Sequence, residues 1–260
     1  MKTAALIPAY NNESTVVEVV RRTMPHVDEV VVINDGSTDS TGKVVSYLIG
    51  SSRTQNIKLL SLQINGCKGN ALKNGFRYAL EKKFEVVVIL DADMEHNPDE
   101  IPPLLRKIKN FDMIITQRNR YRSLLRKKLN RWATLWVRML IPGIEDTQCG
   151  FRVLKTELLK KMTLVSNDFS IELEMILEAY RNNAKISFNP VKIKTAATSS
   201  VTLASYLSIN DTFDRWFIRN HRTLSIGLFK KKIILMMSYL GLLSGFMVRT
   251  ALKWIPIQCC

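Results

Sequence analysis

Residues 84–98 read FEVVVILDADMEHNP, and this stretch decides the fold of the chain. Its first part, residues 86–90, is continuously apolar and mostly β-branched, which is typical of a strand buried on both faces. Three carboxylates and an imidazole follow at once: Asp91, Asp93, Glu95 and His96. Because like charges repel at such close range, the stretch predicts a cation where the strand leaves its sheet. A divalent metal that carries a phosphorylated ligand is the cation we expect.

Apolar runs and helix-forming segments alternate along the first half of the chain. Strands are expected at residues 4–8, 29–34, 57–62, 86–90 and 113–116. Helices are expected between them, at residues 12–24, from the DGSTDST turn to residue 49, from the NGCKGNALKNG motif on to residue 82, and from Pro98 towards residue 109. Strands that alternate with helices in this way predict an α/β fold, with a mostly parallel sheet between layers of helices.

The second half of the chain continues this pattern less regularly. The turn IEDTQCGFRVLK, residues 144–155, leads into an expected strand and helix, and residues 171–181 have the apolar periodicity of a helix. Residues 185–193 alternate like a strand. Residues 195–210 are rich in Ser and Thr and are expected to form a loop that can include some helix. One α/β domain over residues 1–225 is therefore expected.

The chain has a formal net charge of +15, which points to an anionic partner: nucleic acid, an anionic membrane or a phosphorylated small molecule. Eleven Lys or Arg and one acidic residue lie between Arg106 and Arg138. A basic amphipathic helix is predicted by the apolar residues at helical spacing in this block: Leu125, Leu129, Trp132, Trp136 and Met139. The alternative is a helix that packs on the core and leaves its basic face in solvent.

The C-terminal segment differs from the rest in hydropathy. Residues 233–248 carry no charge, are apolar on all sides, and follow three lysines at residues 230–232. The run is slightly shorter than the ~20 residues of a typical membrane span, and residues 250–257 could extend it. We expect residues 226–260 to form a membrane-associated apolar helix and tail, with a buried C-terminal helix as the alternative. The flanking lysines then place residues 1–225 on the cytoplasmic side.

Three polar clusters follow expected strands, at residues 8–13, 35–39 and 91–96. In a parallel sheet the ligand crevice lies outside the carboxyl ends of the strands, so these clusters should meet. Asp91 and Asp93 are two residues apart and share a face in extended backbone, which suits one Mg²⁺ or Mn²⁺. The chain has neither G-x-G-x-x-G after its first strand nor a Walker A lysine motif, which disfavours NAD-dependent enzymes and P-loop NTPases.

Five motifs in a fixed order carry a resemblance to a known family. They are PAYNNE (8–13), VVINDGSTDST (31–41), NGCKGNALKNG (65–75), LDADMEHNPDEIP (90–102) and EDTQCGFR (145–152). Together they resemble the family-2 glycosyltransferases of the GT-A fold. The last two particularly resemble the dolichyl- and polyprenyl-phosphate sugar synthases, the branch that includes dolichol-phosphate mannose synthase. The resemblance covers about residues 3–195 and implies a Rossmann-like GT-A domain that uses an NDP-sugar.

The resemblance also implies roles for individual residues. The nucleoside of the NDP-sugar would be held by Pro8, Tyr10, Glu13 and Asp35. Asp91 and Asp93 would hold the metal and the diphosphate. Glu95 stands where this branch usually has Gln, and would be a third metal ligand. Lys68 and Ala92 complete the expected nucleotide-binding set.

The catalytic set implied by the resemblance reaches into the second half of the chain: Asp93, Arg118, Arg131, Asp146, Gln148 and Arg152. Its first two arginines would hold phosphates, although the usual glycine-rich context around Arg118 is missing. Its last three residues would lie near the acceptor. Tyr10 and Asp146 could instead be packing and turn residues, and His96 would support a neighbouring ligand rather than react. The loop around Ser199 departs most from the family's pattern.

Three functions stay open at this point. The first is a metal-assisted inverting glycosyltransferase that moves a hexose from GDP-mannose or UDP-glucose to a membrane polyprenyl or dolichyl phosphate. A lipid phosphate is already ionised near neutral pH and needs no general base, whereas a sugar hydroxyl needs one. The second is a family-2 enzyme that acts on a glycan or glycolipid hydroxyl. The third is a non-enzymatic basic module that binds membrane or nucleic acid; the intact Asp91/Asp93 pair argues against it, and we expect no nucleic-acid partner.

Overall fold

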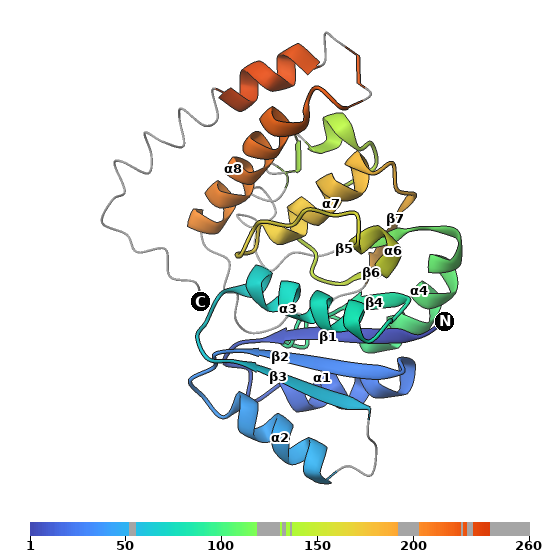
Figure 1. Cartoon of the computed structure of the whole chain (residues 1–260), viewed down its shortest axis with the longest axis vertical. Helices are drawn as coiled ribbons and strands as arrows, with labels where there is room; N and C mark the ends of the chain where they lie inside the picture. Colours follow the sequence, from blue (N-terminus) through green and yellow to red (C-terminus); the bar gives the residue numbers. More distant parts are fainter. Residues whose placement is uncertain are drawn as a thin grey trace.

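The computed structural model describes residues 1–51, 56–118, 131, 134–135, 137–191, 203–224, 226–227 and 231–239 (Figure 1). Within these ranges one seven-stranded sheet has the order β3-β2-β1-β4-β6-β5-β7. The strands are β1 (Thr3–Ala9), β2 (Glu29–Asp35), β3 (Ile57–Leu62), β4 (Val86–Ile89), β5 (Met113–Arg118), β6 (Arg152–Lys155) and β7 (Ile186–Val191). Neighbours pair in parallel except at β6, which is antiparallel to β4 and β5. The predicted mostly parallel α/β sheet is confirmed.

Helices connect these strands. They are α1 (Val16–Thr23), α2 (Thr41–Ser51), α3 (Lys68–Glu81), α4 (Ile101–Lys107), α6 (Thr156–Leu159), α7 (Ile171–Arg181) and α8 (Leu203–Asn220), with short 3₁₀ turns η1 (Met24–His26), η2 (Pro98–Glu100) and η3 (Ile108–Asn110). The order of elements agrees with the sequence pattern, and α7 has the predicted bounds. Helix α3 begins inside the glycine-rich motif, and α8 begins within the Ser/Thr-rich stretch that was expected to be a loop with some helix.

The start of α1 also differs from the prediction, by four residues. Asn11 has a φ of 53°, in the left-handed region that Asn tolerates better than most residues. The Asn12 side chain accepts a hydrogen bond from Tyr10 N at 3.0 Å, while its carbonyl accepts from Val16 N at 2.9 Å. These local bonds compete with helical pairing, so the polar segment forms a turn and the helix begins at Val16.

Both faces of the sheet are buried, in two separate apolar clusters. In β4, Val87 and Ile89 lie in one cluster, while Val86 and Val88 lie in the other. The first cluster also contains residues of α3, α7 and α8, and the second contains residues of α1, α2 and α4. The continuous apolar run of β4 is thus explained by two-sided burial. A strand fixed on both faces gives the loop that follows it a rigid base.

Much of the predicted basic helix lies outside the described residues. Of its C-terminal part, residues 137–140 are helical, with Val137 and Leu140 buried and Leu135 exposed. The predicted apolar tail is described only over residues 231–239, which are helical and bury Ile234 in the same cluster as α8. No helix in the described ranges combines the length and hydropathy that crossing a membrane requires. The boundary between residues 225 and 226 stays a prediction.

A half-buried carboxylate on α8, Asp214, gives a first testable prediction. Burial, together with the nearby Asp211 carboxylate, raises the pKa of Asp214 to about 7. A folded pKa above the unfolded value of about 3.9 contributes stability at low pH, and this contribution is lost as the pH rises through about 7. Asp214→Asn is therefore expected to flatten the decline of Tm between about pH 4 and pH 7. The control is Glu157→Gln at an exposed position of α6, and an unchanged decline in Asp214→Asn would contradict the assignment.

Candidate active site

The loops that follow β2, β1 and β4 share one edge of the sheet, because these strands are parallel neighbours. The first two loops are bonded to each other. Thr38 N donates to Asn11 Oδ1 at 2.9 Å, and Ser40 N donates to Glu13 Oε2 at 2.8 Å. The polar clusters at residues 8–13 and 35–39 therefore meet, and the cluster at residues 91–96 follows the adjacent strand.

Asp35 ends β2 in a cradle formed by the backbone before α3. Its side chain is 3% exposed, and Gly66 N donates to its Oδ1 at 3.0 Å. Burial raises the pKa of Asp35, although the backbone N–H groups of Gly66 and Cys67 oppose this rise. Of the other predicted nucleoside residues, Pro8 and Tyr10 are half-buried and Glu13 is exposed. A carboxylate held in this way can accept hydrogen bonds from a ligand at the sheet edge.

Asp91 has a basic side chain beside each of its oxygens. Lys68 Nζ lies 2.5 Å from Oδ1, and His96 Nε2 lies 3.6 Å from Oδ2. Burial would raise the pKa of Asp91, but the Lys68 ammonium and the His96 ring outweigh it and hold this pKa well below its usual range. His96 is itself buried and its ring packs 5.6 Å from that of Phe151. Its position agrees with the predicted supporting role.

Asp93, unlike Asp91, lies beside other carboxylates rather than between basic side chains. Burial and the charges of Asp91 and Glu95 raise its pKa, although Glu95 N donates to Asp93 Oδ1 at 2.9 Å. A cation beside Asp93 would relieve this repulsion. Within the described ranges, no group of three or more His, Cys, Asp or Glu side chains is arranged to hold a metal. The donor set fits a divalent ion held by Asp93 and completed by the oxygens of a phosphorylated ligand, rather than a preformed cage.

Arg118 and Asp146 form a buried ion pair that joins the two halves of the chain. Arg118, the last residue of β5, donates from Nε to Asp146 Oδ2 at 2.6 Å and from Nη2 to Oδ1 at 3.0 Å. Its Nη1 also lies 3.5 Å from Glu95 Oε1, so the arginine bridges the loop after β4 to the loop before β6. Burial opposes ionisation of Asp146, but Arg118 lowers its pKa below the usual range. The structure thus pairs a predicted phosphate-binding residue with a predicted acceptor residue.

Of the three remaining predicted residues, Arg152 and Gln148 lie at the loop before β6. Arg152, 1% exposed, donates to the backbone carbonyls of Thr147 at 2.8 Å, of Cys149 at 2.9 Å and of Glu172. It therefore positions the loop before β6. Gln148 is buried, and its backbone N donates to Asp146 Oδ1 at 2.9 Å. Arg131 is exposed, and most of the segment around it lies outside the described residues.

Comparison with known families assigns the chain to one of them. The profile of the family described as Glycosyl transferase family 2 matches residues 4–185, which include the loops after β1, β2 and β4 and the Arg118–Asp146 pair. The chain belongs to this family. It is a glycosyltransferase, and the resemblance carried by the five motifs is confirmed.

Distant relatives of this family-2 glycosyltransferase are polyprenyl- and dolichyl-phosphate sugar transferases. A dolichyl-phosphate beta-glucosyltransferase of Trichomonas vaginalis is 28% identical over 250 residues, which cover 84% of this chain and 76% of the relative. An undecaprenyl-phosphate mannosyltransferase of Micrococcus luteus is 25% identical over 203 residues, which cover 74% of this chain and 83% of the relative.

A solved structure supports the fold of the glycosyltransferase. Glucosyl-3-phosphoglycerate synthase from Mycobacterium tuberculosis, in complex with Mn²⁺, UDP and glucosyl-3-phosphoglycerate, superposes with a TM-score of 0.67. The sequence identity is 18%, and the match covers 83% of this chain and 79% of that one. At this identity the likeness shows the GT-A-like fold.

Glu172 is the site residue that the sequence did not predict. It lies in the first turn of α7, is 4% exposed, and its Oε1 lies 2.6 Å from Lys68 Nζ. The segment IELEMILEAYR shows an ordinary amphipathic helix, in which a glutamate is expected to face solvent. A long-range contact between α3 and α7 buries this one, and no local pattern signals such a contact.

Gly150 gives a second testable prediction, because the loop before β6 packs directly on Asp91. A Cβ at Gly150 would lie 2.7 Å from Asp91 Cγ, so a side chain there must displace the carboxylate. Gly150→Ala is expected to reduce kcat/KM for sugar transfer about 10²-fold, since a misplacement of about 1 Å has this effect on a positioned group. Gly50→Ala in α2 is the control, because a Cβ there meets nothing within 4 Å. Wild-type kcat/KM in Gly150→Ala would contradict the prediction.

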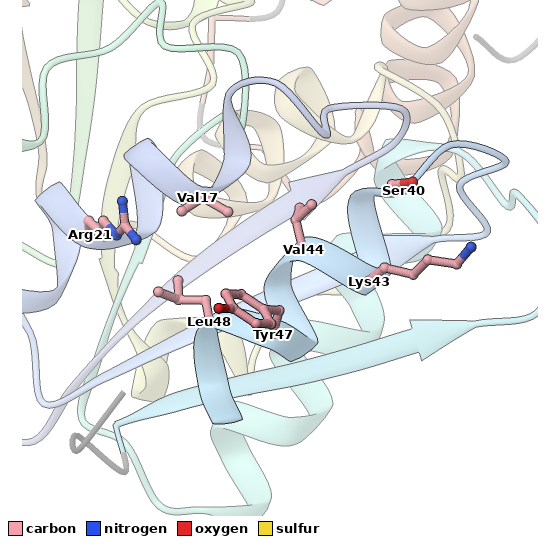
Figure 2. A pocket seen from close by; sticks show the side chains of 7 residues that line it. All are labelled: Val17, Arg21, Ser40, Lys43, Val44, Tyr47 and Leu48. Atoms are coloured by element: carbon pink, nitrogen blue, oxygen red, sulfur yellow. The ribbon is translucent and has the colours of Figure 1, made fainter. Parts of the chain in front are cut away.

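A surface cavity of about 330 Å³ lies between α1 and α2 (Figure 2). It is lined by Val17, Arg21, Ser40, Lys43, Val44, Tyr47 and Leu48. Figure 2 shows the basic side chains of Arg21 and Lys43 towards opposite ends of an apolar row. None of the lining residues is a predicted site residue, and the carboxylates after β4 do not line the cavity. We assign it no part in the transfer reaction.

Proposed function

We propose that this glycosyltransferase inverts the anomeric centre as it moves a hexose from GDP-mannose or UDP-glucose to a polyprenyl or dolichyl phosphate in a membrane, assisted by Mg²⁺ or Mn²⁺. The observation that carries the proposal is the carboxylate cluster after β4, in which Asp93 is crowded by Asp91 and Glu95. The dolichyl- and undecaprenyl-phosphate transferases among its relatives support the acceptor class. The Mn²⁺ and UDP in the mycobacterial structure support the donor class and the metal.

The donor would bind across the edge formed by the loops after β2, β1 and β4. Asp35 would accept hydrogen bonds from the ribose or the base, and Pro8, Tyr10, Glu13 and Ala92 would line the nucleoside. Asp93, with Asp91 and Glu95 beside it, would hold the divalent ion. When bound, the ion neutralises the charge that develops on the departing nucleoside diphosphate. Lys68, protonated between two carboxylates, adds a fixed positive charge near the same position.

The ion pairs made by the acidic side chains around the site support a phosphate acceptor. Asp146 is held ionised by Arg118, and Glu172 is paired with Lys68. A carboxylate that is already bound to a cation is a weak general base, and a sugar hydroxyl would require such a base. A lipid phosphate attacks without one. The block from Arg118 to Arg131 and the apolar residues 233–248 would hold the domain to the cytoplasmic side of the membrane. Residues 119–130 and 240–248 lie outside the described residues.

The test uses the purified full chain. Thermal-shift measurements with GDP-mannose and UDP-glucose, with and without Mn²⁺ or Mg²⁺, should reveal a donor that raises Tm only when the metal is present. Radiolabelled transfer from that donor to dolichyl or undecaprenyl phosphate in detergent is then expected. Transfer to a saccharide hydroxyl, with none to a lipid phosphate, would overturn the acceptor assignment and favour the hydroxyl alternative.

A further inference from the structure

Lys68 is shared between two carboxylates that come from opposite sides of the site. Its Nζ lies 2.5 Å from Asp91 Oδ1 and 2.6 Å from Glu172 Oε1. The side chains of Lys68 and Glu172 are 11% and 5% exposed, so water screens their ion pair only weakly. The Phe169 ring lies 5.9 Å from the ammonium, next to Glu172. The distances from the ammonium to the carboxylate on α7 and to the carboxylate after β4 are thus nearly equal.

Glu172 is itself fixed in place. Its backbone carbonyl accepts a hydrogen bond from Arg152 Nη1, and Arg152 also holds the carbonyls of Thr147 and Cys149. The same loop carries Gly150, which packs on Asp91. Arg152 therefore ties Glu172 to the loop that contacts the donor carboxylate.

We propose that Glu172 is a positioning residue for donor binding. By sharing the Lys68 ammonium, which also contacts Asp91, Glu172 weakens the hold of Lys68 on Asp91, so that the metal and diphosphate of the sugar nucleotide can compete for this carboxylate. Without the Glu172 charge, Lys68 has Asp91 as its nearest remaining counter-ion and competes with the divalent ion for it. This inference rests on the proposed function, and it assigns Glu172 no contact with the substrate.

The experiment measures how much Mn²⁺ is needed for the sugar nucleotide to bind, by calorimetric titration of UDP-glucose or GDP-mannose at a series of Mn²⁺ concentrations. Glu172→Gln is expected to raise the Mn²⁺ concentration for half-maximal binding about tenfold or more, the usual effect of losing a residue that orients a metal ligand. Glu172→Asp should restore part of the difference. The control is Glu174→Gln, another buried carboxylate of α7, which accepts hydrogen bonds from Val165 N and Ser166 N.

A double-mutant cycle separates positioning from a general loss of structure. In a Lys68→Met background, Glu172→Gln should leave the Mn²⁺ requirement unchanged, because the residue acts through the lysine. An unchanged requirement in Glu172→Gln, or an equal effect of this substitution with and without Lys68, would overturn the proposal. If the wild-type chain bound neither sugar nucleotide at any Mn²⁺ concentration, the proposed function itself would fail, and the wild-type titration alone identifies that result.

Discussion

Asp93→Asn is expected to reduce kcat/KM for sugar transfer by a factor on the order of 10² to 10³, because the proposed divalent ion would lose the carboxylate that best fits it. The same substitution should leave the fold intact or stabilise it. Burial and the adjacent carboxylates raise the pKa of Asp93, so its ionised form is unfavourable in the folded chain at neutral pH. A neutral amide of the same size removes that repulsion. Loss of activity with an equal or higher Tm is the expected pair of results.

Asp99→Asn is the matched control for this substitution. Asp99 lies a few residues further along, is exposed, and pairs with Arg22 at 3.0 Å. An exposed ion pair of this kind contributes little, so activity and Tm should stay close to wild type. Steady-state transfer assays and thermal melts of the three proteins provide the comparison. A Tm loss in Asp93→Asn that accounts for its lost activity would show that Asp93 is a structural residue.

Arg118→Met is expected to lower the free energy of unfolding by about 3–5 kcal/mol at neutral pH, the usual result of leaving a buried charge without its partner. The substitution leaves two buried carboxylates, Asp146 and Glu95, which are 0% and 4% exposed. Asp146→Asn should cost less, because it leaves Arg118 paired with Glu95 at 3.5 Å. The double variant Arg118→Met/Asp146→Leu should recover part of the loss, since it replaces the pair with apolar side chains.

The pH dependence of this loss has a definite sign. In the wild type, Arg118 lowers the pKa of Asp146, so the pair contributes stability above the ordinary Asp pKa of about 3.9, and this is lost as the pH falls through the lowered value. In Arg118→Met, burial without the cation raises the pKa of the same carboxyl above its ordinary value. The stability gap between the two proteins should therefore narrow as the pH is lowered. Urea titrations at several pH values measure it, and a constant gap would contradict the prediction.

The fold was largely predictable because its elements have local signals. Continuous apolar runs gave β1, β2 and β4, and the amphipathic pattern gave α7 with its bounds. The helix starts were less predictable, since side-chain bonds at Asn11 and Asn12 compete with the first helical turn. The direction of β6 was not predicted, because an apolar run reads alike in both directions and only its pairing with β4 and β5 fixes it.

The site was predictable where it follows from topology and unpredictable where it depends on pairing. Polar residues at the ends of neighbouring parallel strands must meet, which brought Asp35 and the carboxylates after β4 to one edge. The contact between Lys68 and Glu172 joins residues 104 positions apart. Similarly, the family resemblance gave Arg118 a phosphate-binding role, and only the structure shows that its guanidinium is bonded to Asp146. Side-chain partners at such separations are decided by the packing of α7 and the loop before β6.

The Arg118–Asp146 pair has a consequence for the segment of chain that lies between these two residues. Arg118 is the last residue of β5, and Asp146 lies a few residues before β6. The two hydrogen bonds between their side chains therefore hold the two ends of the intervening segment together. The described part of this segment is not independent of its sequence, because Val137, Leu140 and Ile144 are buried in the core cluster that also contains residues of α3, α7 and α8. An exchange of residues 119–145 for the segment of a relative therefore has to keep the Arg118–Asp146 pair and these apolar positions. A chimaera that keeps them should melt close to the wild-type Tm, whereas one that loses Arg118 or Asp146 should melt at a lower temperature.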